Sequence, residues 1–198
     1  MVRATLDDSK TQTRRIVKPK VAETLNWFGG KDGVDDDRTL DELLGQRIEE
    51  KGVRVWCADY PEEGSELIHC HYGQPGDQLW VREAWSTHRC FDDRPPRDLK
   101  GSFHYWADGE IQTGKRRPSI HMPRWASRIT LEITGVRVER LQDISRGDAM
   151  AEGCPFPNMA QGADPRNWYA DLWNSINGPD SWDANPWVWV VEFKRVKP

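Results

Sequence analysis

The chain has 198 residues and a formal net charge of −4, so its length suits one domain and its charge excludes a strong global attraction to nucleic acid. No apolar run reaches the roughly 18 residues of a membrane span, and residues 1–8 lack the apolar segment of a signal peptide. Because four cysteines in a chain of this size do not make a disulfide framework, we expect a cytoplasmic protein with no membrane contact.

The first predicted elements are a short helix and an extended segment. Residues 2–9 fit a helix, because Val2 and Leu6 lie four positions apart on one face. The polar segment "KTQTRR" follows at 10–15. Since side chains alternate along a strand, this segment points two sets of residues to opposite sides. One set is Thr11, Thr13 and Arg15, and the other is Lys10, Gln12 and Arg14.

Residues 18–75 are weakly patterned, and we interpret them as a long insertion that lies mostly at the surface. Within them, residues 39–50 predict a short helix, in which Thr39 and Glu42 form a capping box. The apolar positions of this helix are Leu40, Leu43, Leu44 and Ile48.

The second half of the chain predicts several strands. Alternating apolar residues predict a long strand over 128–141, and a change of parity after Thr134 and Gly135 predicts a bulge within it. Shorter runs predict a strand from Leu79 that bends near Glu83, a strand over 102–108, and a closing strand over 186–196.

Two helices are expected between the long strand and the closing strand. Residues 143–153 form the first, with Gly153 as its C-cap. Residues 164–176 form the second, with Asp164 as its N-cap. Its apolar stripe consists of Trp168, Leu172 and Ile176. The order of all these elements predicts an α+β fold with a small mixed barrel at its centre.

The chain holds eleven tryptophans, most of which core packing explains, while a few are candidates for stacking on a base. Trp125 lies in a basic segment at 115–128. Arginine near tryptophan suits contact with phosphate and base stacking, but a basic loop covering a barrel end has the same composition. The basic residues are Lys115, Arg116, Arg117, Arg124 and Arg128.

Lys10 and Thr13 are the first candidates for chemistry. A threonine hydroxyl becomes a nucleophile when a base takes its proton, and a lysine is such a base only when it is neutral. Burial or the neighbouring Arg14 and Arg15 would lower the lysine pKa. Strand alternation separates the two side chains, so they meet only if the chain turns near Ser9. The alternative is a solvated turn.

A second candidate is the pair Arg82 and Glu83, which lies among hydrophobic residues. It predicts either an ion pair at a strand edge or the polar groups of a binding site where the strand bends.

Metal and cofactor sites are not predicted. Possible zinc ligands lack the spacings typical of zinc sites, and neither a G-x-S-x-G elbow nor a glycine-rich phosphate loop occurs. These possible ligands are Cys57, His69, Cys70 and His71, or His88 and Cys90.

Four ordered blocks resemble the phage- and prophage-encoded branch of the ASCH domain family, whose fold is a PUA-like β-barrel. The blocks are "KTQTRR", "GQPGDQLWVREAW", "SIHMPRWASRITLEITGVRVERLQDISRGDAMAEG" and "LWNSING…WDANPWVWVVEF". They cover most of the chain except about 18–70. The resemblance implies one ASCH domain over 1–198, a small mixed PUA-like β-barrel flanked by short helices, with the insertion at about 18–75.

Small bacterial members of this family are amidohydrolases that deacylate N4-acetylcytidine. The resemblance implies that Lys10 activates Thr13 for attack on the amide carbonyl, and that Glu152 holds Lys10 or carries the proton to the leaving amine. It further implies a pocket for a modified cytidine nucleoside without any cofactor. The residues implied to line this pocket are Arg15, Arg82, Glu83, Arg124 and Trp125.

Two other functions stay open at this point. One is an RNA-binding or RNA-processing module, since PUA-like folds often bind RNA and the segment 115–128 is basic. The other is a phage structural or regulatory protein without catalysis. Relatives usually carry a strand before the first helix, and its absence would leave an open barrel edge that invites pairing, so we expect a monomer or a weak dimer.

Overall fold

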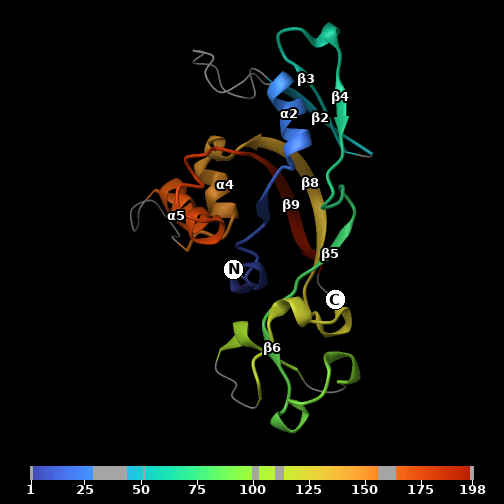
Figure 1. Cartoon of the computed structure of the whole chain (residues 1–198), viewed down its shortest axis with the longest axis vertical. Helices are drawn as coiled ribbons and strands as arrows, with labels where there is room; N and C mark the ends of the chain where they lie inside the picture. The colour runs from blue at the N-terminus through green and yellow to red at the C-terminus, as the bar shows by residue number, and fades with distance from the viewer. Residues whose placement is uncertain are drawn as a thin grey trace.

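The computed structural model describes residues 2–28, 44–50, 52–99, 103–109, 114–155 and 164–196. At its centre is a four-stranded antiparallel sheet in the order β1-β9-β8-β5, which curls into half a barrel (Figure 1). The strands are β1 (Gln12–Ile16), β5 (Gln78–Trp80), β8 (Thr130–Arg140) and β9 (Trp187–Val196). The predicted α+β class is confirmed, and the sheet is a curled half-barrel.

The described residues also form two smaller sheets, four α-helices and several short 3-10 helices. The smaller sheets are β2-β3-β4, made of Leu44–Glu49, Gly52–Cys57 and Glu66–Ile68, and β6-β7, made of Trp85–Ser86 and His104–Tyr105. The helices are α1 (Val2–Leu6), α2 (Pro19–Phe28), α4 (Arg146–Ala151) and α5 (Pro165–Asn177). None of the described helices is both long and apolar enough to cross a membrane.

Strand β9 is the centre of the sheet, since it pairs with β1 on one side and with β8 on the other. Residues Trp187–Val191 are all buried, which explains their unbroken apolar run. Trp189 packs with β2 and β3 on one face, whereas Val188 packs with α4 and α5 on the other. The pairing of β8 with β9 shifts register between Ile133 and Gly135, so the predicted bulge is confirmed.

Most described residues of 18–75 are exposed or half-buried, as predicted, but several others are buried in the main core. Buried residues from α2 and from the β2-β3-β4 sheet join the same core cluster as Val136 and Trp189 of the central sheet. These residues are Leu25, Leu44, Val53, Val55 and Ile68. The segment therefore covers one face of the half-barrel and is part of its core.

The helix predicted over 39–50 is wrong where it can be judged. Residues 44–49 form strand β2, which pairs in antiparallel register with β3, while 39–43 lie outside the described residues. Leucine and isoleucine at helical spacing are compatible with a strand once a partner strand is present. The pairing also explains the glycine at position 45. A Cβ there would lie 2.1 Å from Trp56 Nε1 on the facing strand.

Helix α5 is confirmed, but its buried face is not the predicted stripe. Pro165, Tyr169 and Trp173 are buried, whereas Ile176 is 64% exposed. The helix packs against Leu141, Ile144 and Ala149, the last of which lies in α4. This contact turns Tyr169 toward the sheet and leaves Trp168 and Leu172 at the flank of the cluster.

The described residues between 82 and 127 form a lobe at one end of the molecule, the lower one in Figure 1, where β6 is labelled. Its described part has a small core of its own around Trp85, Leu99 and Met122. Strand β5 ends at Trp80 and β6 starts at Trp85, so the chain leaves the main sheet close to the bend predicted at Glu83.

The contribution of β2 to the core can be tested with two substitutions in the same strand. Leu44 is 1% exposed and Ile48 is 47% exposed. We expect Leu44→Ala to lower the free energy of unfolding by about 2–5 kcal/mol, because it leaves a cavity in the main core. Ile48→Ala should change it by less than about 1 kcal/mol. Urea unfolding followed by tryptophan fluorescence measures both, and equal small effects would place β2 outside the core.

Candidate functional site

A turn between α1 and β1 positions Lys10. Asp8 adopts a left-handed conformation with a φ of 56°, and the amides of Ser9 and Lys10 both donate to the carbonyl of Ala4. The amide of Thr11 then donates to the carbonyl of Ala151 at the end of α4. A turn near Ser9 is therefore present, but Lys10 stays on the same side of the chain as Gln12 and Arg14.

Lys10 forms a buried ion pair with Glu152, the residue that follows α4. Lys10 Nζ lies 2.5 Å from Glu152 Oε2 and donates to the Glu152 carbonyl at 3.0 Å. The two residues are only 9% and 1% exposed. Gly153 permits this approach, because its φ is 94° and a Cβ there would lie 3.3 Å from Lys10 Cβ.

Helix α4 places Glu152 by its own local signals. Ser145 is the N-cap, and its hydroxyl accepts from the amide of Asp148. The helix is then fixed to β1 by Gln12, whose side-chain amide donates to Asp148 Oδ1 at 2.9 Å. The alternation predicted for "KTQTRR" is confirmed here, since Lys10, Gln12 and Arg14 all contact α4 or Glu152.

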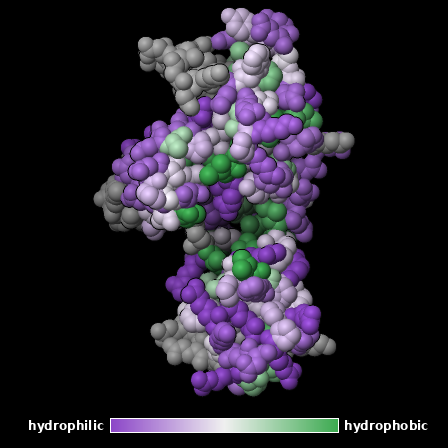
Figure 2. All heavy atoms as spheres, viewed as in Figure 1, coloured by the Kyte–Doolittle hydropathy of each residue, from purple (hydrophilic) through white to green (hydrophobic). Residues whose placement is uncertain are grey.

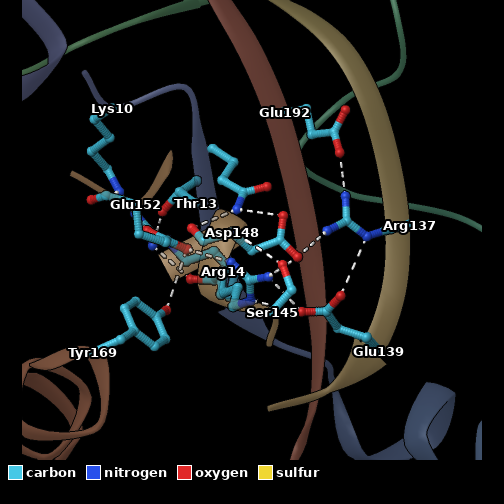
Figure 3. Close-up of polar contacts among 12 residues, drawn as sticks. Lys10, Thr13, Arg14, Arg137, Glu139, Ser145, Asp148, Glu152, Tyr169 and Glu192 are labelled. Atoms are coloured by element: carbon cyan, nitrogen blue, oxygen red, sulfur yellow. Dashed lines mark hydrogen bonds and ion pairs between the residues drawn. The ribbon is translucent and has the colours of Figure 1, made fainter. Parts of the chain in front are cut away.

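Arg14 lies between Glu152 and a second group of carboxylates, as Figure 3 shows. It is 2% exposed, and its guanidinium contacts Glu152 Oε1 at 3.2 Å and Glu139 Oε1 at 2.6 Å. Beyond Glu139, Arg137 binds Asp148 and Glu192. Every charge of this chain of ion pairs thus has an opposite neighbour, as buried charges require.

Burial and neighbouring charges shift several pKa values in this network. Burial lowers the pKa of Lys10, and Arg15 and Arg14 add to this effect, while Glu152 opposes it. Burial raises the pKa of Tyr169, as does Glu152, which accepts from its hydroxyl at 3.3 Å. Burial therefore favours the neutral amine of Lys10 over its ammonium form.

A cavity of about 720 Å³ opens beside the ion pair. Figure 2 shows the same face hollowed between the body that carries the main sheet and the lower lobe. Lys10, Thr13 and Glu152, the three residues predicted as catalytic, all line the cavity. Much of the remaining lining is apolar or aromatic, and it includes Leu79, Trp80, Leu131, Tyr169, Leu172, Trp173 and Phe193.

Thr13 does not bond directly to Lys10 in this structure. Its Oγ1 accepts a hydrogen bond from Arg15 Nη1 at 2.7 Å, and within the described residues Lys10 Nζ bonds only to Glu152. The guanidinium occupies a lone pair of the hydroxyl oxygen and leaves the hydroxyl proton available to a base.

The other predicted pocket residues divide into two groups. Arg15 and Arg82 line the cavity. Glu83 and Trp125 do not, and their assignment to the pocket is corrected. Glu83 is buried in a bidentate pair with Arg128 at 2.9 Å, and Trp125 packs on Phe103 in the lower lobe. Arg124 is not part of the lining, but its guanidinium lies 5.8 Å from the ring of Trp80.

Sequence reasoning missed Tyr169 and the carboxylates Glu139 and Asp148. Tyr169 lies one position from the predicted apolar stripe of its helix, so its buried position was not apparent from spacing. Glu139 lies within a predicted strand that carries polar residues on one face, and this pattern predicts that the face is exposed to solvent. Glu139 in β8 reaches Arg14 in β1 because both strands pair with β9 in the same sheet, which the spacing within one strand does not reveal.

Neither a family model, nor a curated protein, nor a solved structure matches the chain. The geometry of the site therefore carries the functional argument.

The candidate zinc ligands do not come together in the described residues, where no three His, Cys, Asp or Glu side chains gather at metal-binding distance. His88 Nδ1 and Cys90 Sγ lie 3.1 Å apart in the lower lobe, as an exposed pair. Two such groups are fewer than the three or four ligands of a protein zinc site.

Loss of Arg14 should destabilise the fold strongly. Arg14→Ala leaves Glu139 and Glu152 buried without this partner, so we expect the free energy of unfolding to fall by about 3–5 kcal/mol. Urea denaturation measures this change. The control is Arg47→Ala, which removes an exposed partner of Glu49 and should have little effect. Equal effects of the two substitutions would contradict a structural role for the network.

Proposed function

We propose that the chain is a cytoplasmic amidohydrolase of PUA-like fold that removes the acyl group from N4-acylcytidine-type nucleosides. The observation that supports this most is the buried Lys10–Glu152 pair in the wall of a cavity that Thr13 also lines. The cavity volume of about 720 Å³ lies within the range of small-molecule sites. Its aromatic and apolar lining suits a planar base.

In the first step the neutral Lys10 amine takes the hydroxyl proton of Thr13, and Thr13 Oγ1 attacks the acyl carbonyl carbon. The C–N bond to the cytosine N4 then breaks, and the Lys10 ammonium returns its proton to the departing N4. Cytidine leaves, and the acyl group remains on Thr13 as an ester.

In the second step a water molecule attacks the ester carbonyl and gives a proton to Lys10. The ester bond breaks, Thr13 Oγ1 recovers the proton, and the carboxylic acid leaves. In each of the two steps the same group first accepts a proton and then donates it. A general base performs both transfers best when its pKa lies near the working pH.

The surrounding charges support these roles. Arg15 donates to Thr13 Oγ1, so it stabilises the negative charge that develops on this oxygen during proton loss. Glu152 holds the Lys10 amine at the cavity wall. Before attack, a rotation of the Lys10 or Thr13 side chain has to bring the two groups together, as catalytic hydrogen bonds often tighten only when substrate binds.

Turnover of N4-acetylcytidine tests the roles of Lys10 and Thr13. We expect Lys10→Ala and Thr13→Ala each to lower kcat/KM by at least about 100-fold, because they remove the base and the nucleophile. Thr13→Ser, which keeps the hydroxyl, should retain measurable activity. Release of cytidine, followed by liquid chromatography, gives the rates.

The matched control is Thr11→Ala. Thr11 is an exposed threonine two positions away, and it is not part of the cavity that Thr13 lines. It should keep the wild-type rate. No turnover by the wild-type protein at micromolar concentration would end the proposal, and equal losses in Thr11→Ala and Thr13→Ala would remove Thr13 from the mechanism.

The pH dependence of kcat/KM tests Lys10 as the base. The neutral amine is the active form, so the rate should rise with pH up to an apparent pKa below the ordinary lysine value. Glu152→Gln removes the charge that raises the Lys10 pKa, and the rising limb should therefore move to lower pH by at least about one unit. Glu192→Gln alters a carboxylate whose ion pair among the described residues is with Arg137, and it should leave the limb in place. An unmoved limb in Glu152→Gln would assign the base to another group.

A second candidate function is RNA binding without catalysis. The observation in its favour is that arginines pack over exposed or half-buried tryptophans beside the lower lobe, as Arg116 does over Trp106 at 5.3 Å. Arg117, by contrast, donates to the carbonyls of Phe91, Asp92 and Arg94 inside the lobe and serves its structure. Absence of turnover together with retained RNA binding would favour this candidate.

A further inference from the structure

Three arginines at the solvent side of the cavity have no carboxylate partner in the described part of the chain. Arg15 and Arg82 are exposed residues of the cavity lining, and Arg124 is an exposed residue whose guanidinium lies near the ring of Trp80. By contrast, Arg14 and Arg128 each bind two carboxylates or more. In a chain with more acidic than basic residues, this unbalanced group of cations marks a place for an external anion.

Trp80 joins this group to the cavity. Its ring lines the cavity, and the guanidinium carbons of Arg82 and Arg124 lie 4.6 Å and 5.8 Å from the ring centre. Arg82 Nη1 also donates to the carbonyl of Ile120 at 3.3 Å. Contact with the ring limits the rotation of both guanidinium groups and leaves N–H donors free for a ligand.

A neutral nucleoside would leave these donors without a counter-charge. Arginine is the residue that recognises phosphate best, since its planar fork donates two parallel hydrogen bonds to two oxygens. The catalytic wall with Lys10 and the arginines Arg15 and Arg82 belong to one cavity, so one ligand can reach both.

We propose that the substrate of this site carries a phosphate beside the acylated cytosine, and that Arg82, with Arg15 and Arg124, binds it. The proposal rests on the proposed deacylation and specifies its substrate as a nucleotide. The phosphate can be the 5′-phosphate of a mononucleotide or a backbone phosphate of a single strand, and the two are distinguished below.

Binding tests the proposal without turnover. Equilibrium titrations with cytidine and with cytidine 5′-monophosphate, followed by calorimetry, should give a dissociation constant about tenfold lower for the monophosphate. Arg82→Gln and Arg124→Gln should reduce this ratio to about threefold or less. The control is Arg97→Gln, which makes the same charge change at an exposed residue of the lower lobe outside the cavity lining, and it should keep the wild-type ratio.

Turnover distinguishes the two sources of phosphate. The substrates are N4-acetylcytidine, its 5′-monophosphate, and a short single-stranded oligoribonucleotide with one internal N4-acetylcytidine. A higher kcat/KM for the monophosphate than for the other two assigns the arginines to a terminal phosphate, and a higher value for the oligonucleotide assigns them to a strand. In either case, Arg82→Gln should reduce the preference for the favoured substrate.

Equal binding of cytidine and its monophosphate, or a ratio that Arg82→Gln leaves unchanged, would overturn the phosphate assignment even if deacylation occurs. If no substrate is deacylated while the monophosphate still binds more tightly in an Arg82-dependent manner, the proposed function fails and the phosphate site stands. The two failures are therefore separate.

Discussion

The position of Glu152 between Lys10 and Arg14 is the interaction on which the site depends. Its two carboxylate oxygens meet one cation each, and all three side chains are buried. A buried charge without a partner is strongly unfavourable, so this arrangement fixes the end of α4 against the start of β1. Residues that are 142 positions apart in sequence are thereby held together at the edge of one cavity.

The same arrangement divides the cations of the site into two kinds. Arg14 and Arg137 are balanced by Glu139, Asp148 and Glu192, and their role is to hold strands and α4 together. Arg15 and Arg82 lie on the opposite, open side, where no described carboxylate balances them. Burial lowers the pKa of Lys10, which pairs with Glu152 in the lining of the same cavity. The site therefore combines a neutralised support with exposed arginines, on which the proposed phosphate site depends.

Local signals in the sequence were sufficient for the long elements and not for the short ones. The parity change near Gly135 and the apolar run 187–191 gave the bulged strand and the central strand, because both patterns are local. Residues 44–49 form a strand only because β3 supplies its partner, which spacing within the segment does not reveal. At the site, residue chemistry identified Lys10 and Thr13 as candidates, and a resemblance added Glu152. Tyr169 joins the site through the packing of α5. Glu139 joins it through the pairing of β1 and β8 with β9.

Two of the ion pairs in the molecule are of different kinds. Arg128 binds the buried Glu83 at 2.9 Å, a longer distance than the 2.5 Å between Lys10 and Glu152. Glu83 lies outside the described cavity linings, and its partner is an arginine, which stays charged. A lysine in the same setting can lose its proton, and its ammonium contributes less bidentate bonding than a guanidinium would. Since buried ion pairs add little to stability compared with apolar packing, the position of Lys10 in the lining of a cavity is the feature on which its proposed role in proton transfer rests.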